Sequence, residues 1–319
     1  MRGLHATPWQ RLGLGLLLPL VLLLFVGGPD AGWGRSARQA WQFGHVILFF
    51  LVAWLLLPVL RCRYRERTVI TGVLLGAAAL GLLIEWLQGF VGREVSWADV
   101  RLDVLGAALA LPWRRGAVPA HPAGGRPLGA GLIAAAAGLA LLWLDARPLL
   151  GSVLDEYRAR RDFPLLAGWA SERELGRLSA NGPLQIVEAP GRPGERALSI
   201  RLRPGRYAGF QFDYFPPDWR GFRVLQLELH LPPGAPGSVT CRIHDRSHDN
   251  RYADRFNRRF PVLPGWNALR LPLAEVQAAP RGRPMDMAHL TGLGCFFVGL
   301  EQPMDLGLGT VGLLQGGSE

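Results

Sequence analysis

The hydrophobic pattern changes near residue 150, from long apolar runs to short alternating segments. Five runs in the first half predict helices: Leu12–Val26, Phe43–Leu60, Val69–Phe90, Trp97–Trp113 and Leu128–Leu144. A helix that crosses a membrane needs about 20 apolar residues. The second and third runs reach this length, the first and fifth reach it with flanking residues, and the fourth is shorter and carries three charges. We therefore expect about five transmembrane helices within residues 1–150.

The arginines between these runs predict how the helices cross. Clusters stand before the first run, after the second and after the fourth: Arg2 and Arg11; Arg61, Arg63, Arg65 and Arg67; Arg114, Arg115 and Arg126. Five crossings place all three clusters on the cytoplasmic side, as the positive-inside rule requires, whereas a re-entrant fourth run would leave the third cluster outside. We expect a protein of a bacterial-type inner (cytoplasmic) membrane with its second half on the outer face.

Residues 163–319 predict an all-β domain, joined to the helices by a charged linker at 151–162. Apolar and polar residues alternate in segments separated by Pro and Gly turns: Ala197–Arg203, Gly209–Phe215, Val224–Leu231, Ser238–His244 and Tyr252–Val262. Such alternation is typical of strands with one buried and one solvated face. The segments predict a jelly-roll sandwich in which one sheet presents an outer face rich in His, Arg, Asn and Glu.

Polar residues gather at one end of the second, third and fourth apolar runs. Five crossings bring these residues together in the outer leaflet: His45, Glu85, Gln88, Arg93, Ser96, Asp99 and Asp103. Glu85 and Gln88 share a helix face at a spacing of three residues. Ionisable groups at membrane depth are costly, so they indicate a functional site. The alternative is a structural cluster that holds short helices together, with Arg93 pairing a carboxylate.

The same residue types allow an enzymatic interpretation. Glu85 or Asp99 would act as general base and His45 as general acid on an envelope lipid, while Arg93 neutralises a phosphate. The sequence contains no nucleophile elbow, HExxH motif or phosphate-binding Gly loop, so binding is favoured over catalysis. The other candidates for substrate binding in this cluster are Gln88, Ser96 and Asp103.

This arrangement resembles the pattern of VanZ-like membrane proteins. The resemblance covers about residues 10–145 and is carried by His45, Glu85-x-x-Gln88, Arg93-x-x-Ser96-x-x-Asp99 and Gly106. Trp41 and Gln42 stand where the family usually has an Asp-Lys pair, and Asp103 stands where it usually has Asn. The family is named for a member linked to reduced sensitivity to glycopeptide antibiotics. The resemblance therefore implies a function in the cell envelope.

The β domain resembles jelly-roll domains of the carbohydrate-binding-module type. The resemblance is carried by IHDRSHDNRYADRFN, followed by PGWNALRLPL and AAPRGRPMD, and covers most of 163–315. In such folds a polar concave face commonly holds a glycan. The resemblance thus implies Arg242, His244, Arg255 and Asn257 as substrate-binding residues. For these four residues, the alternative is an ordinary solvated sheet face.

Charge and cysteines narrow the choice of partners. The net charge of +10 lies mostly in the first half, which has 14 Arg and 7 acidic residues against 21 and 18 in the second. The sequence has no basic patch interleaved with aromatic residues, so we do not expect nucleic-acid binding. Cys62, Cys241 and Cys295 show no CxxC spacing, and we expect no metal and no cofactor. Cys241 and Cys295 either form a disulfide or stay as buried thiols.

Together these patterns predict a membrane protein that recognises a cell-envelope glycan or lipid-linked glycan. The helical half would lie in the lipid bilayer and hold a polar head group, such as that of a polyprenyl-linked lipid. The sandwich would hold the sugar. The alternatives are an enzyme that acts on such a lipid and a purely structural envelope anchor.

Overall fold

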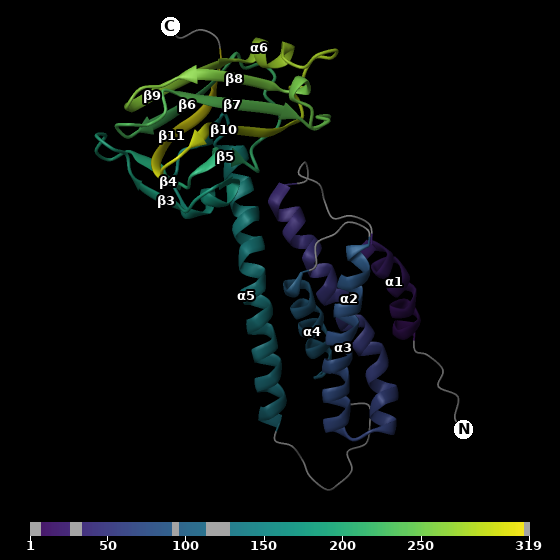
Figure 1. Ribbon diagram of the computed structural model, residues 1–319. Coiled ribbons are helices and arrows are strands. Elements are labelled where there is room, and N and C mark those ends of the chain that lie inside the picture. Colours follow the sequence, from purple (N-terminus) through teal and green to yellow (C-terminus); the bar gives the residue numbers. More distant parts are fainter. Residues whose placement is uncertain (1–7, 26–33, 91–95, 113–127, 316–319) are drawn as a thin grey trace. The chain divides into compact units, whose positions relative to one another are not determined.

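The structure, a computed structural model, describes residues 8–25, 34–90, 96–112 and 128–315 (Figure 1). Contacts divide the chain into two compact units. We call them the helical unit, which comprises Met1–Asp30 and Ser36–Leu150, and the β unit, which comprises Ala31–Arg35 and Gly151–Glu319. Each unit has its own hydrophobic core.

Helices form at all five predicted apolar runs. They are α1 Pro8–Phe25, α2 Gly34–Arg63, α3 Glu66–Gly89, α4 Trp97–Ala110 and α5 Leu128–Arg161. Prolines lie inside three of them, namely Pro19 in α1, Pro58 in α2 and Pro148 in α5. Because membrane helices tolerate Pro better than exposed ones, these positions agree with the apolar character of the runs.

The number of helices that qualify as membrane spans is three among the described residues, not about five. They are α2, α3 and the part of α5 from Ala136 to Arg161. The 14 residues of α4 rise only about 21 Å, which is less than the roughly 30 Å of a hydrocarbon core. In α1 the apolar helix is also shorter, Leu14–Leu23. Hydropathy alone thus predicted the helices correctly but overestimated the number of spans.

The packing of α3 illustrates the helical unit. Its buried residues recur every three or four positions and are Val69, Val73, Ala77, Gly81, Ile84, Glu85 and Gln88. This buried face lies against α4. On the opposite face Leu75, Leu82 and Trp86 are exposed. A helix that is apolar on both its packed and its exposed side is typical of a segment surrounded by lipid.

Two antiparallel sheets form the β unit (Figure 1). The first sheet has the order β3-β4-β11-β6-β9 with β1 beside β11, and the second has the order β2-β5-β10-β7-β8. The strands are β1 Leu165–Ala167, β2 Leu178–Ala180, β3 Leu184–Glu188, β4 Arg196–Leu202, β5 Gly205–Phe212, β6 Val224–Leu231, β7 Ser238–Asp245, β8 Phe256–Pro261, β9 Gly265–Pro272, β10 Leu290–Leu300 and β11 Met304–Leu314. One continuous apolar core fills the space between the sheets. The predicted β-sandwich is therefore confirmed.

The prediction that a single sheet carries the polar outer face was wrong. β6 belongs to the first sheet, whereas β7 and β8 belong to the second. Alternation in β6 correctly predicts that Leu227 is buried and Glu228 is turned away from the core. It cannot tell which neighbour a strand pairs with, because the period of two reports faces only. The polar faces of β6 and β7 consequently lie on opposite sides of the sandwich.

Two central strands, β10 and β11, were not predicted. Both contain several glycines, which interrupt the apolar alternation that marks a strand. β10 pairs with β5 and β7, and a disulfide joins Cys295 of β10 to Cys241 of β7 beneath the outer face. Both cysteines lie in the core. Of the two states predicted for Cys241 and Cys295, a disulfide or buried thiols, the structure shows the disulfide.

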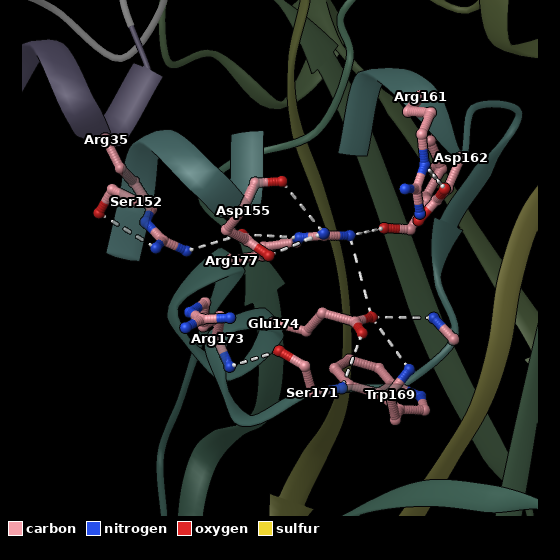
Figure 2. A network of polar contacts seen from close by, with 12 residues as sticks. Arg35, Ser152, Asp155, Arg161, Asp162, Trp169, Ser171, Arg173, Glu174 and Arg177 are labelled. Atoms are coloured by element: carbon pink, nitrogen blue, oxygen red, sulfur yellow. Dashed lines mark hydrogen bonds and ion pairs between the residues drawn. The ribbon is translucent and has the colours of Figure 1, made fainter. Parts of the chain in front are cut away.

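The predicted linker at 151–162 is helical, because α5 continues to Arg161. Its last turns belong to the β unit. Figure 2 shows the contact: the guanidinium of Arg177 donates to both carboxylate oxygens of Asp155, at 2.9 and 2.8 Å. Arg35 donates to the same carboxylate at 3.3 Å. Because Asp155 and Arg177 are both buried, this pair fixes the end of α5 to the sandwich.

Candidate functional site

The outer face of the second sheet carries a groove of about 700 Å³. Side chains alternate along strands, so every second residue of β5, β10, β7 and β8 points into it. The register places Gln211, Gly294, Arg242 and Asn257 in one row across these four strands. The sequence analysis named Arg242 and Asn257, and the structure brings them together with Arg255 in the lining.

Gly294 shapes the floor of this row. A Cβ at this position would lie 2.7 Å from the carbonyl oxygen of Phe210, so a larger residue would push β10 away from β5. Without a side chain here, Arg242 crosses the floor and donates a hydrogen bond to the Gln211 side-chain oxygen. Gly294, one of the glycines that hid β10 from sequence analysis, therefore leaves the floor of the groove free for the Arg242 side chain.

Aromatic rings stand along the groove. Tyr207 and Tyr252 are 59% and 71% exposed. Phe296 packs edge-to-face against Tyr207 with ring centroids 5.4 Å apart, which holds the tyrosine in place. The guanidinium of Arg255 lies 5.7 Å from the Tyr252 ring. Exposed rings on a concave face offer a flat apolar surface to a ligand.

Three buried polar atoms of residues that line the groove have no hydrogen-bond partner among the described residues. They are Arg255 Nε, Asn257 Oδ1 and Asn181 Oδ1, and all three residues line the groove. Buried polar atoms are nearly always paired, so an unpaired set calls for water or a ligand. One donor and two acceptors suit a ligand whose hydroxyl groups can both donate and accept.

The groove is electropositive. Its lining residues include Arg242 and Arg255 but, in the part of the chain that the structure describes, no Asp or Glu. Burial, together with the nearby charge of Arg255, lowers the pKa of Arg242. A ligand with an acidic or hydroxyl-rich surface would relieve this repulsion.

His244 lies apart from the groove, although its strand predicts the same face. The imidazole occupies the space that a Cβ of Gly292 would need, and it stacks on His248 at 4.7 Å. Desolvation, followed by the positive charge of His248, Arg242 and Arg255, lowers its pKa to about 4. The ring is thus neutral at ordinary pH and packs against its neighbours.

The sequence analysis missed the aromatic residues of the groove. Tyr207 stands two residues before Gly209, so the alternation of β5 places both on the outer face. An exposed Tyr in such a position is the available signal. Phe296 could not be found this way because its strand was not recognised. Trp266 donates its ring N–H to the Pro190 carbonyl at 2.8 Å and lies on the other sheet.

A second cluster of predicted residues lies within the helical unit. His45 Nδ1 is 2.9 Å from Asp103 Oδ1, and His45 Nε2 is 3.9 Å from Asp99 Oδ2. Glu85 Oε2 accepts a hydrogen bond of 2.6 Å from the backbone N–H of Ser96. His45, Glu85, Asp99 and Asp103 are all buried. Three helices, α2, α3 and α4, thus bring together four of the predicted side chains.

Two glycines allow the helices to approach this closely. A Cβ at Gly81 of α3 would lie 2.5 Å from Asp103 Oδ2, and one at Gly106 of α4 would collide with the backbone of Val46. Larger residues at either position would separate the helices and move the carboxylates apart. The sequence analysis named Gly106 as part of the motif, and this contact gives its physical reason.

The remaining predicted residues have distinct positions. Gln88 is buried on α3, one turn after Glu85. Ser96 caps the amino end of α4, where its hydroxyl oxygen accepts from the Asp99 N–H at 3.3 Å. Arg93 lies outside the described residues, so its predicted pairing with a carboxylate stays a prediction.

Comparison with solved structures finds similar folds for the β-sandwich. A family 11 carbohydrate-binding module from Clostridium thermocellum, in complex with a β-1,3-1,4-mixed-linked tetrasaccharide, is 10% identical with a TM-score of 0.37, covering 47% of this chain and 94% of that one. A family 30 carbohydrate-binding module of a cellulosomal cellulase from the same organism is 13% identical with a TM-score of 0.32. The match covers 48% of this chain and 94% of that one. An exo-β-agarase is 10% identical with a TM-score of 0.40. The match covers 49% of this chain and 25% of that one.

No protein-family model matches the chain, and no curated protein matches it either. The VanZ-like resemblance of the helical unit therefore rests on its motif alone.

Proposed function

We propose that this protein is a membrane protein whose β-sandwich binds a cell-envelope glycan, or the glycan of an envelope lipid, in the groove over β5, β10, β7 and β8. The observation that carries the proposal is the combination of exposed rings with unpaired polar atoms. Tyr207 and Tyr252 offer surfaces on which a sugar ring can stack. Arg255 and Asn257 offer hydrogen bonds to its hydroxyl groups.

The membrane assignment is supported by the surface of the helices. Large apolar side chains are exposed on α3, and Leu75 and Trp86 are examples. Monomeric soluble proteins seldom expose extended apolar surfaces of this kind. The lipid bilayer is the partner that would cover them.

The disulfide between Cys241 and Cys295 supports a location of the β unit on the outer side of the membrane. Disulfides persist in oxidising compartments and are rare in the cytosol. The arginines between α2 and α3 favour the cytoplasmic side for that loop. We therefore propose that the β unit is extracytoplasmic.

The glycan proposal is tested on the full chain in detergent micelles by calorimetric titration with two probes, a soluble peptidoglycan fragment and a mixed-linked β-glucan tetrasaccharide. We expect one probe to bind and Arg255→Ala to weaken that binding without changing the melting temperature. Arg201→Ala is the matched control, because Arg201 is exposed on the first sheet and pairs with Asp305. Unchanged affinity in Arg255→Ala would refute the proposal, and so would unfolding of the β unit, which would make Arg255 structural.

The topology is tested with a reporter that is active only outside the cytoplasm. Fusion after Glu319 should give activity and fusion after Arg65 should not. The helices that qualify as spans, α3 and α5, would by themselves return the chain to the side of Arg65. Activity after Glu319 without activity after Arg65 would therefore show that α4, although shorter than a usual span, crosses as well. The opposite pattern would place the β unit in the cytoplasm.

A second candidate function is favoured by the buried cluster. His45 lies within 4 Å of carboxylates on both sides, which is an arrangement suited to proton transfer. In this alternative the protein acts on a lipid-linked substrate, with Glu85 or Asp99 as base. Glu85→Gln keeps size and removes proton transfer, so turnover of such a lipid should be lost while the protein still accumulates in the membrane.

A further inference from the structure

We propose that His45, Glu85 and Asp99 bind a divalent transition-metal ion in the helical unit. Each residue offers one ligand atom, and these atoms lie within 4.8 Å of one another. The three residues come from α2, α3 and α4 and are all buried. The metal site lies in the helical unit and the glycan groove lies in the β unit, so an experiment can refute either proposal without refuting the other.

The hydrogen bond between His45 and Asp103 supports this assignment. His45 Nδ1 lies 2.9 Å from Asp103 Oδ1, so in the tautomer that binds a metal through Nε2, Nδ1 carries the proton and donates it to this carboxylate. The lone pair of the neutral ring is then on Nε2, the atom 3.9 Å from Asp99 Oδ2. Metal-binding histidines usually donate their second N–H to a carboxylate in this manner. Asp103 would thus orient the ligand without touching the ion.

The unpaired oxygens supply an independent observation. Glu85 Oε1 and Asp99 Oδ1 are buried and have no hydrogen-bond partner among the described residues. Removing a carboxylate from water without a counter-charge is costly, and none of the described arginines forms an ion pair with Glu85, Asp99 or Asp103. A bound cation would balance their charge.

The donor set indicates which ion fits. One imidazole nitrogen with carboxylate oxygens suits Zn²⁺ or Mn²⁺. Two ligand atoms on a tetrahedral zinc lie about 3.4 Å apart, so the 3.9 Å between His45 and Asp99 needs only a small movement. Three protein ligands also leave one position open for water, as in catalytic zinc sites. The sequence analysis expected no metal because the cysteines show no CxxC spacing. His45, Glu85 and Asp99 stand on three different helices and form no local motif.

The test uses the full chain in detergent, stripped with a chelator and then equilibrated with Zn²⁺ or Mn²⁺ alone. Bound metal is measured by mass spectrometry of the elements after gel filtration. We expect about one ion per chain, a large loss in Glu85→Gln and Asp99→Asn, and a 10–100-fold weaker affinity in Asp103→Asn. Glu66→Gln is the matched control, because it removes a carboxylate from the same α3 outside the cluster.

A second readout protects against variants that fold poorly. The metal should raise the melting temperature of the wild-type chain and of Glu66→Gln, since a ligand that binds only the folded state stabilises it. Binding of no metal by the wild-type chain would overturn the proposal and leave protons or Arg93 to balance the carboxylates. Equal binding in Glu85→Gln, Asp99→Asn and the wild type would overturn it as well, because the metal would lie elsewhere.

Discussion

In the helical unit, His45, Glu85 and Asp103 are at most 2% exposed, whereas in the groove of the β unit Tyr207 and Tyr252 are mostly exposed. Both regions contain polar atoms without partners. In the helical cluster these are carboxylate oxygens that lie among other acids. In the groove they are two amide oxygens and a guanidinium N–H beside aromatic rings.

This difference separates two kinds of recognition. Buried carboxylates with unpaired oxygens suit a small cation or a proton. An open groove with rings and neutral hydrogen-bonding groups suits a large, hydroxyl-rich ligand. Removal of a side chain should therefore lower the free energy of unfolding in the first region and the affinity for the ligand in the second.

The largest effect is expected in the helical cluster. Asp103→Ala leaves the Nδ1–H of His45 buried and unpaired, and a buried donor without its charged partner costs up to about 3 kcal/mol. Unfolding of the full chain in detergent measures it. Asp145→Ala is the control in the same unit, because its partner Arg101 is largely exposed and such a pair contributes about 1 kcal/mol or less. Equal small losses in both variants would show that the cluster is hydrated.

The groove should respond in the opposite way. Tyr207→Ala removes an exposed ring, and covering roughly 80 Å² of apolar surface is worth about 2 kcal/mol, or about 30-fold in affinity. The melting temperature should stay unchanged. Tyr157→Ala removes another exposed tyrosine of the β unit outside the groove and should leave titration with the bound glycan probe unaltered. Loss of affinity in both variants would contradict a specific site.

A pH effect distinguishes His244 from the groove residues beside it. The pKa of His244 falls from 6.5 to about 4 on folding, so protonation favours the unfolded chain. The free energy of unfolding should be constant above pH 6.5 and decrease as the pH falls toward 4, by at most about 2 kcal/mol at pH 5. Asp254 has a folded pKa of about 2, so its contribution is lost at lower pH.

Thermal unfolding followed by near-ultraviolet circular dichroism measures this loss, and His244→Gln should remove most of it. A decrease of the same size in the variant would assign the effect to other groups. Glycan affinity should not follow this curve, because His244 lies outside the lining of the groove.

Several of these features could be predicted from sequence because they depend on local period. Alternation in β7 places Arg242 outward and Cys241 inward, and the spacing in α4 places Asp99 and Asp103 together on its buried face. Neither result depends on which element packs beside the strand or helix. The helices and the sandwich followed from the same periods.

The features that could not be predicted depend on partners distant in sequence. Pairing of β10 with β5 brings Phe296 beside Gly209, and the glycines of β10 hide the strand while allowing its neighbours to approach. The number of membrane spans was predicted wrongly for a different reason. α4 is apolar enough to form a helix but too short to qualify as a membrane span. The position of His244 outside the groove likewise could not be predicted, because it depends on the space beside Gly292 in the neighbouring strand.

The smallest effect compares two asparagines of the β unit. Asn257 has an unpaired Oδ1 and donates from Nδ2 to the Tyr252 carbonyl at 3.2 Å. Asn267 accepts from the Leu263 N–H and donates to the carbonyls of Leu263 and Gly265. Asn257→Ala should therefore weaken glycan binding by about 1 kcal/mol, or roughly 5-fold, with a smaller loss of stability than Asn267→Ala, because it breaks one hydrogen bond and not three. Asn267→Ala should lower the free energy of unfolding by about 1–2 kcal/mol and leave affinity intact, since it breaks a turn. Calorimetric titration and unfolding of both variants give the comparison, and a stability loss in Asn257→Ala as large as that in Asn267→Ala would make Asn257 a structural residue.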